Sequence, residues 1–341
     1  MIPRKVLIIQ TAFLGDVILA TGLIEKIKQT SPDAIVDFLL KKGNESILAN
    51  NPQIRKVLVF DKKRRIGSMY RLIREIRKEK YDLVLNLHRF ASSGILAMCS
   101  AGTQIAGFDK NPFSFLYSRS YMHEIGKPGV HEIDRNALLI EDWCGKERVM
   151  PRMYISGKEE KRIEPYQEQP YVCMAPGSVW FTKRFPQSKW VELLDNLSGD
   201  FNVYLLGAPG EKQLCEEIIE KTINPRVMSL AGELSVTASA ALMKDAVMNV
   251  VNDSAPLHIA TAVNAPVCAV FCSTVPEFGF GPLSQKSYVV ETKNTLTCRP
   301  CNLHGKATCP LGHFDCAQTI KVERIREIIE NQYASSRKAE E

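Results

Sequence analysis

Strand and helix signals alternate along the whole chain. Short runs rich in Val, Ile and Leu, typical of fully buried parallel strands, are each followed by a segment in which apolar residues recur with helical spacing. Parallel strands need helical crossovers between them, so the pattern predicts an α/β fold with doubly wound parallel sheets. The expected strands cover residues 6–9, 35–40, 56–60, 83–87, 171–175, 202–206, 226–229, 246–251 and 267–271.

The length of the chain and one change in composition predict two domains. A chain of 341 residues is too long for one small core, and a polar, proline-bearing stretch at 156–170 interrupts the alternation. We expect Rossmann-like domains at 1–160 and 161–341, with a last helix over about 322–333 that could pack back on the first domain. Two such domains leave a cleft lined by the carboxyl ends of both sheets, where substrates are expected.

The composition excludes several classes of protein. Hydrophobic residues make up 45% and charged residues 24% of the chain, ordinary globular values that argue against extensive disorder. No run of about twenty apolar residues and no apolar leader segment is present, so we expect a cytoplasmic protein without a membrane span. Most of the ten cysteines lie in apolar runs, as is typical of a reducing compartment.

A basic loop and a basic amphipathic helix occupy residues 62–80. A charge run of this kind is often only the solvated face of a helix. Its functional interpretation is attraction to an acidic substrate or to an anionic membrane surface, worth on the order of 1 kcal/mol for each Lys or Arg near that surface. No nucleic-acid-binding motif accompanies the segment, so nucleic acid is not an expected partner.

The strand expected at 246–251 runs into a predicted anion-binding corner. Asp253 and Ser254 are natural helix N-caps, Pro256 suits a first helical turn, and a helix of small residues follows with His258 near its start. The free N–H groups and the positive dipole end of such a helix point out of the sheet edge, where α/β proteins bind phosphorylated ligands. The alternative is that Asp253 and Ser254 only cap the helix.

The turn after the first strand carries a candidate general base. Residues 10–17 lack the G-x-G-x-x-G fingerprint, which argues against a nicotinamide-dependent dehydrogenase. Gly15 permits a tight turn, and Asp16 stands at the start of the first helix, on the side of the expected cleft. Asp16 is either an N-cap or a base that takes a proton from a substrate.

Two stretches of the second domain suit a nucleotide. After the strand at 171–175, Gly177 and Ser178 offer backbone and hydroxyl donors, while Lys183 and Arg184 add positive charge that suits a diphosphate. Glu211 follows the next strand and turn, where it could hold a pair of ribose hydroxyls or simply begin a helix.

In this order, the motifs resemble glycosyltransferase family 9, the ADP-heptose:lipopolysaccharide heptosyltransferases, and in particular heptosyltransferase II. The resemblance rests on residues 14–17, 81–87, 176–186, 206–211 and 252–260. It implies a GT-B fold of two Rossmann-like domains and a catalytic base at Asp16. The residues expected to bind the donor are Gly177, Ser178, Lys183, Arg184, Glu211, Leu234, Asp253, Ser254, Ala255 and His258.

The resemblance implies an inverting transfer of L-glycero-D-manno-heptose from ADP-heptose to the inner core of lipopolysaccharide, at the cytoplasmic face of the inner membrane. The alternatives are a GT-B transferase with another nucleotide sugar, or a non-catalytic protein that binds nucleotides or anionic glycans. The residues expected to bind the acceptor are Lys62, Lys63, Arg64, Arg65, Arg89, Arg119, His131 and Arg135.

A cysteine-rich stretch near the carboxyl end admits a structural metal. Cys298, Cys301, Cys309 and Cys316 have a spacing that could hold a tetrahedral zinc ion, and similar stretches occur in the second-heptose branch of the family. We favour reduced thiols that brace a loop. No cofactor and no catalytic metal are expected, because Lys183, Arg184 and a helix N-terminus can neutralise a leaving diphosphate.

Overall fold

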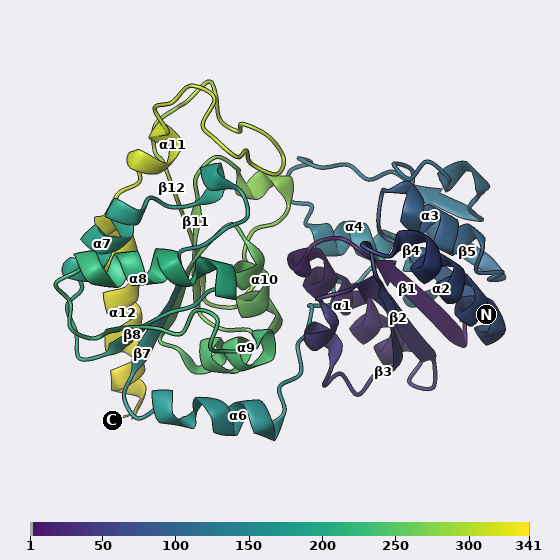
Figure 1. Cartoon of the computed structure of the whole chain (residues 1–341), viewed down its shortest axis with the longest axis horizontal. Coiled ribbons are helices and arrows are strands. Elements are labelled where there is room, and N and C mark those ends of the chain that lie inside the picture. The colour runs from purple at the N-terminus through teal and green to yellow at the C-terminus, as the bar shows by residue number, and fades with distance from the viewer. Residues whose placement is uncertain (1–2, 341) are drawn as a thin grey trace. The chain divides into compact units, whose positions relative to one another are not determined.

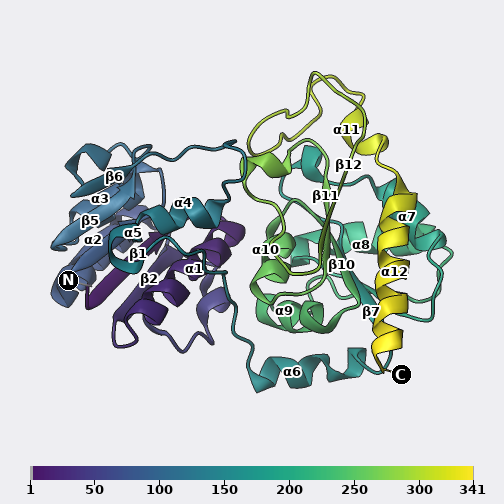
Figure 2. The ribbon, with the colours of Figure 1, turned by 180° about the vertical axis from the view of Figure 1, so that it is seen from behind.

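The computed structural model describes residues 3–340 and divides after Tyr154 into two compact units. Each unit contains one six-stranded sheet with helices packed against it (Figures 1 and 2). All pairs of neighbouring strands in both sheets are parallel. The predicted α/β fold with two Rossmann-like sheets is therefore confirmed.

In the first sheet the strand order is β3-β2-β1-β4-β5-β6. The order reverses between β1 and β4, and the carboxyl ends at such a switch point are where sheets of this kind bind ligands. The strands are β1 (Lys5–Gln10), β2 (Ile35–Lys41), β3 (Ile54–Phe60), β4 (Leu83–Asn86), β5 (Gln104–Phe108) and β6 (Arg119–Tyr121).

The helices of the first unit bury apolar side chains against this sheet. Leu72 of α2 and Leu96 of α3 join a core cluster with Leu7 and Ile9 of β1, whereas α1 packs against α4 and α5. The helical segments are α1 (Leu14–Thr30), η1 (Glu45–Leu48), α2 (Arg65–Glu79), α3 (Ala91–Met98), η2 (Ser114–Leu116), α4 (Glu132–Leu138) and α5 (Glu141–Cys144).

The second sheet has the order β12-β11-β10-β7-β8-β9, with its reversal between β7 and β10. The central strands are buried at every residue, which explains why they show as continuous apolar runs in the sequence. The strands are β7 (Tyr171–Ala175), β8 (Asn202–Leu205), β9 (Val227–Ser229), β10 (Met248–Asn252), β11 (Val267–Phe271) and β12 (Ser287–Glu291).

The last helix, α12, belongs to the second unit. Its Ile325 and Ile329 are buried in that unit's core, which is where its apolar face packs, and the helix continues to Glu340 instead of ending near 333. None of the helices in residues 3–340 is long and apolar enough to cross a membrane. The helical segments of this unit are α6 (Gly157–Ile163), η3 (Glu164–Tyr166), η4 (Phe181–Lys183), α7 (Gln187–Asp195), η5 (Pro209–Glu211), α8 (Lys212–Lys221), α9 (Val236–Asp245), α10 (Ala255–Ala262), η6 (Pro276–Phe278), α11 (Asp315–Gln318) and α12 (Val322–Glu340).

Residues 155–160, which the sequence assigned to the first domain, lie in the second unit. They belong to helix α6 and its start, in a segment that the sequence predicted to be a linker. Glu159 accepts a hydrogen bond from the Ser156 N–H at 3.1 Å and another from the Thr237 hydroxyl of α9 at 3.1 Å. A capping box thus stabilises the start of a short helix in a polar segment, and the hydrogen bond from Thr237 joins this helix to α9. The edge strands β6 and β12 were not predicted, because they are short or largely exposed.

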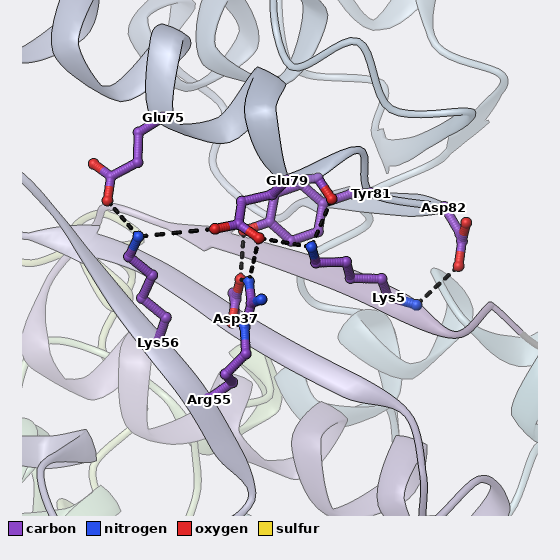
Figure 3. A network of polar contacts seen from close by, with 8 residues as sticks. All are labelled: Lys5, Asp37, Arg55, Lys56, Glu75, Glu79, Tyr81 and Asp82. Atoms are coloured by element: carbon purple, nitrogen blue, oxygen red, sulfur yellow. Dashed lines mark hydrogen bonds and ion pairs between the residues drawn. The ribbon is translucent and has the colours of Figure 1, made fainter.

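A network of charged groups joins α2 to the amino-terminal ends of β1, β2 and β3 (Figure 3). The buried Asp37 accepts hydrogen bonds from both Arg55 Nε at 3.0 Å and the Tyr81 hydroxyl at 2.5 Å. Glu79 at the end of α2 pairs with Lys5 at 2.6 Å and with Arg55 at 2.7 Å. These two cations hold the pKa of Glu79 near 2. The network fixes the helix on the sheet.

Asp37→Asn should destabilise the first unit. The amide retains one acceptor and turns an N–H group toward the Arg55 guanidinium, which cannot accept a hydrogen bond, so we expect the free energy of unfolding to fall by about 2 kcal/mol. Equilibrium unfolding in urea measures the change. The matched control is Asp33→Asn at an exposed carboxylate, with an expected effect within about 0.5 kcal/mol. Equal effects of the two substitutions would show that the network adds no stability.

Candidate active site

Asp16 lies in the first turn of α1, directly after β1. Its carboxylate accepts a hydrogen bond from the Phe13 N–H at 3.1 Å. The N-cap residue is Phe13 and Asp16 is the third residue of the helix, so Asp16 contributes the acidic side of a capping box and is not the N-cap itself. The pKa of Asp16 is raised to about 6, first by burial and then by the negative charge of Glu132, against the opposing effect of the Phe13 N–H. A carboxylate with this pKa is largely ionised at neutral pH and still basic enough to take a proton from a substrate.

Glu132, the first residue of α4, stays anionic although it is buried. Arg135 Nε donates to its Oε2 at 2.7 Å, and His123 Nε2 lies 3.1 Å from its Oε1. Burial opposes ionisation, but the hydrogen bond from His123 and the charges of His123 and Arg135 hold the pKa of Glu132 below its usual range. A permanent negative charge therefore acts on Asp16.

Three basic side chains lie near the carboxyl-terminal edge of the first sheet and contribute positive charge there. They are Lys41 at the end of β2, Lys62 before α2 and Arg89 after β4. Their charges add to the larger effect of burial and lower the pKa of His88 to about 4, so this side chain is neutral at pH 7. The charges of Lys41 and Asp16 also act on each other. The carboxyl ends of β1, β2 and β4 thus bring one acid and several bases together.

The other basic residues predicted for the acceptor have different surroundings. Lys63, Arg64 and Arg65 are exposed in the loop and first turn of α2. Arg119 pairs with Asp142 and lies over the Trp143 ring, with its guanidinium carbon 4.7 Å from the ring centre. These groups remain accessible to an anionic ligand to different degrees.

His131 and Arg135 are buried, and the structure uses both to hold α4 in place. His131 Nδ1 accepts a hydrogen bond from the Ile133 N–H at 3.2 Å and so caps the helix. Besides Glu132, the Arg135 guanidinium donates to the carbonyl oxygens of Glu124 and Val130, at 3.3 Å and 3.2 Å. In this structure, Arg135 therefore holds Glu132 instead of presenting its charge at the surface.

In the second unit, β10 leads to the start of α10 as predicted, but the polar contacts there differ. Ser254 is the N-cap residue, yet its side chain makes no capping hydrogen bond. Asp253 instead accepts a hydrogen bond from the Thr274 hydroxyl at 2.6 Å and forms an ion pair with Lys183 at 2.8 Å. The capping role expected of the Ser254 side chain was wrong.

The Lys183–Asp253 ion pair is mostly buried, with the two side chains 15% and 7% exposed. The loop that carries Lys183 is tied to β10 by Asn252. The Asn252 amide donates to the carbonyl oxygens of Pro176 at 2.8 Å and Gly177 at 3.1 Å. Its oxygen accepts a hydrogen bond from the Phe185 N–H at 2.9 Å. One amide therefore holds both ends of the loop at the start of α10.

The structure brings Glu211 and Gly177 into contact. The Glu211 carboxylate accepts a hydrogen bond from the Ala208 N–H at 2.8 Å. A Cβ atom at Gly177 would lie only 1.8 Å from Glu211 Oε1, so a larger residue here would displace the Glu211 carboxylate. Arg184 Nε donates to the Ser178 carbonyl at 2.7 Å and so holds the loop from within.

The remaining donor candidates lie near these turns. Ala255 is the first residue of α10 and is partly exposed, and the buried His258 lies against the Phe280 ring. Leu234 is half-buried in the turn before α9.

Several residues of the site were missed from the sequence. In the first unit they are Thr11, Lys41, His88, His123 and Glu132; the Thr11 hydroxyl and His88 Nδ1 are 2.8 Å apart and join the loops after β1 and β4. Thr11 and His88 lie far apart in sequence, so only the fold reveals this contact, whereas Glu132 and Arg135 are only three residues apart on α4. Asn252 could have been found from the sequence, because it stands at the end of a buried strand directly before Asp253.

The cysteines are free thiols in the structure. Burial, with smaller effects from Cys301, Cys309 and Cys298, raises the pKa of Cys316 to about 12, which keeps this thiol protonated. Within residues 3–340, no group of three or more His, Cys, Asp or Glu side chains is arranged to hold a metal ion.

Comparisons with known proteins agree with this architecture. Residues 69–311 match the model of glycosyltransferase family 9 (heptosyltransferase). Lipopolysaccharide heptosyltransferase 3 of Escherichia coli is 28% identical over 277 residues, covering 77% of this chain and 82% of the relative. Lipooligosaccharide heptosyltransferase 2 of Haemophilus influenzae is 23% identical over 312 residues, covering 84% and 88%.

A solved structure shares the fold over the full length. The E. coli ADP-heptose lipopolysaccharide heptosyltransferase II is 20% identical, with a TM-score of 0.81 and coverage of 98% of this chain and 99% of that one. The two six-stranded parallel sheets are therefore those of the GT-B fold. The chain belongs to glycosyltransferase family 9 and is a glycosyltransferase.

Proposed function

We propose that the chain transfers L-glycero-D-manno-heptose from ADP-heptose to a hydroxyl group of the lipopolysaccharide inner core, with inversion at the anomeric carbon. The observation that carries the proposal is the Asp16 carboxylate, whose pKa is raised to about 6 at an edge of the first sheet that also carries Lys41, Lys62 and Arg89. The names of the relatives from E. coli and H. influenzae support the sugar and the acceptor class. The solved E. coli relative named for ADP-heptose supports the donor.

In the proposed step, Asp16 takes the proton of the acceptor hydroxyl while that oxygen attacks the anomeric carbon. The bond from this carbon to the diphosphate breaks, and ADP leaves with the negative charge. Lys183 and the Ala255 N–H group at the start of α10 stabilise this charge in a largely buried site, where such donors are most effective. Glu211 holds the ribose hydroxyls. No metal and no cofactor are required.

The first unit would bind the acceptor through its exposed basic residues. Phosphates and acidic sugars of the core are the expected targets of Lys62, Arg89 and the neighbouring cations. We also propose peripheral attachment to the anionic cytoplasmic face of the inner membrane, and no role for nucleic acid.

The outer face of α2 supports the membrane attachment. Ile66 is 87% exposed and Tyr70 is 65% exposed, among exposed arginines of the same helix. The two acidic residues of this helix, Glu75 and Glu79, pair with the sheet side (Figure 3), so the outward face keeps its positive charge.

A transfer assay with ADP-heptose and defined core fragments tests the proposed reaction directly. We expect transfer from ADP-heptose and none from UDP- or GDP-sugars. In thermal unfolding, ADP at one hundred times its dissociation constant should add about 2.7 kcal/mol. Transfer from another nucleotide sugar would overturn the donor assignment, and tight ADP binding without transfer would favour a binding protein.

Asp16→Ala should abolish transfer and leave the affinity for ADP nearly unchanged. The variant loses the general base, whose contribution to the rate is roughly 100–10,000-fold. Single-turnover transfer and calorimetric ADP titration measure the two effects separately. Full activity of this variant would remove the base assignment.

The rate should depend on pH through Asp16. Because the pKa of Asp16 is raised to about 6, kcat/KM should fall roughly tenfold per pH unit below that value. The folded chain binds this proton more tightly than the unfolded chain, so the raised pKa also lowers stability as pH rises from 3.8 to about 6. Asp16→Asn should lack this loss of stability. An unchanged kcat/KM down to pH 4.5 would contradict the assignment.

Lys183→Ala should weaken ADP binding roughly 10–100-fold, the loss expected for a charge-assisted hydrogen bond to the diphosphate. Calorimetry measures the affinity, and thermal unfolding checks that the fold survives. The control is Lys189→Ala, which removes an ion pair with Glu192 on the surface of α7 in the same unit. Equal ADP affinities of the two variants would mean that the diphosphate binds elsewhere.

A further inference from the structure

We call residues 298–314, between β12 and α11, the cysteine loop (Figure 1). This loop packs against the segment that carries Lys183. Thr182 is buried, and it both donates a hydrogen bond to this loop and accepts one from it. Its N–H donates to the Lys306 carbonyl at 3.1 Å, and its hydroxyl oxygen accepts a hydrogen bond from the Lys306 N–H at 2.8 Å. The Ser273 hydroxyl also donates to the Thr182 hydroxyl at 2.9 Å. The residue before Lys183 is therefore fixed by the cysteine loop.

Gly305 brings the backbone of this loop onto the Lys183 side chain itself. Gly305 is buried and has a φ of +80°. A Cβ atom there would lie 2.8 Å from Lys183 Cγ and 3.1 Å from Trp180 Cβ, closer than side-chain carbons normally come. The aliphatic part of Lys183 thus rests on a surface that only glycine provides.

The same loop also supports the partner of Lys183. Arg299 donates to the Cys272 carbonyl at 2.7 Å and to the Thr274 carbonyl at 2.8 Å. The Thr274 hydroxyl in turn donates to the Asp253 carboxylate at 2.6 Å. Both members of the Lys183–Asp253 ion pair are therefore held from one loop.

We propose that the cysteine loop positions the Lys183 ammonium group for the donor diphosphate, with Gly305 as the positioning residue. The inference rests on the proposed role of Lys183 in donor binding. On this proposal the loop raises the affinity for the donor, because a cationic group binds a diphosphate well only when its nitrogen is held at the correct place.

A pair of glycine substitutions in the same loop tests this. Gly305 and Gly312 both have a positive φ, +80° and +76°, but a Cβ atom at Gly312 would meet nothing within 4 Å. Gly305→Ala and Gly312→Ala therefore share the backbone strain and differ in the contact with Lys183. We expect Gly305→Ala to bind ADP roughly tenfold more weakly than Gly312→Ala, as when a charge-assisted hydrogen bond is partly lost. Equal ADP affinities in the two variants would overturn the proposal.

A double variant separates positioning of Lys183 from general damage to the site. In a Lys183→Ala background there is no ammonium group to misplace, so adding Gly305→Ala should cause no further loss of ADP affinity. A full additional tenfold loss would show that Gly305 acts on the donor by another route and would overturn the proposal. If Lys183→Ala itself leaves ADP affinity unchanged, the proposed diphosphate site is wrong, a failure distinct from that of the loop.

Substitutions of Thr182 cover the case in which Gly305→Ala does not fold. Thr182→Ser keeps the hydroxyl that links Lys306 and Ser273 to the Lys183 segment, whereas Thr182→Val removes it at similar volume. We expect the valine variant to bind ADP several-fold more weakly and the serine variant to retain near-normal affinity. Equal affinities in both variants would contradict a positioning role for the loop.

Discussion

The Lys183–Asp253 ion pair connects the segments that follow β7, β10 and β11 at one edge of the second sheet. Two charges that are mostly withdrawn from water are tolerated only when they are paired and hydrogen-bonded. The chain meets this requirement with the end of β10, the loop after β7 that Asn252 holds, and Thr274 after β11. A lysine whose position is set in this way is prepared for an anionic ligand.

The first unit places an acid under a comparable constraint. Asp16 closes the first turn of α1, and the buried Glu132 keeps a second negative charge near it. Burial of its carboxylate and the charge of Glu132 make ionisation of Asp16 less favourable, which costs stability at neutral pH and raises its basicity. Carboxylates with strongly shifted pKa values are concentrated at functional sites, where the shifted pKa serves the reaction although it lowers the stability of the fold.

The sequence predicts the parts of the structure that depend on local patterns. Buried parallel strands appear as continuous apolar runs, and the turns with Asp16, Lys183 and Asp253 follow such runs directly, so the sheets and these positions could be predicted. The contacts that complete the site could not. Thr11 meets His88, and Lys183 meets Asp253, only because the fold joins segments that are distant in sequence. Ser254 leaves its expected cap unused, and its hydroxyl donates to the Asn252 carbonyl instead. The short helix α6 was not predicted, because its segment has a polar composition typical of linkers.

The central claim is that the Lys183–Asp253 corner binds the diphosphate of the donor. A crystal structure of the chain with ADP tests it most directly. We expect diphosphate oxygens within hydrogen-bonding distance of Lys183 Nζ and of the Ala255 N–H group at the start of α10, with the ribose hydroxyls at Glu211. ADP bound at another place, with the Lys183–Asp253 pair unchanged, would contradict it.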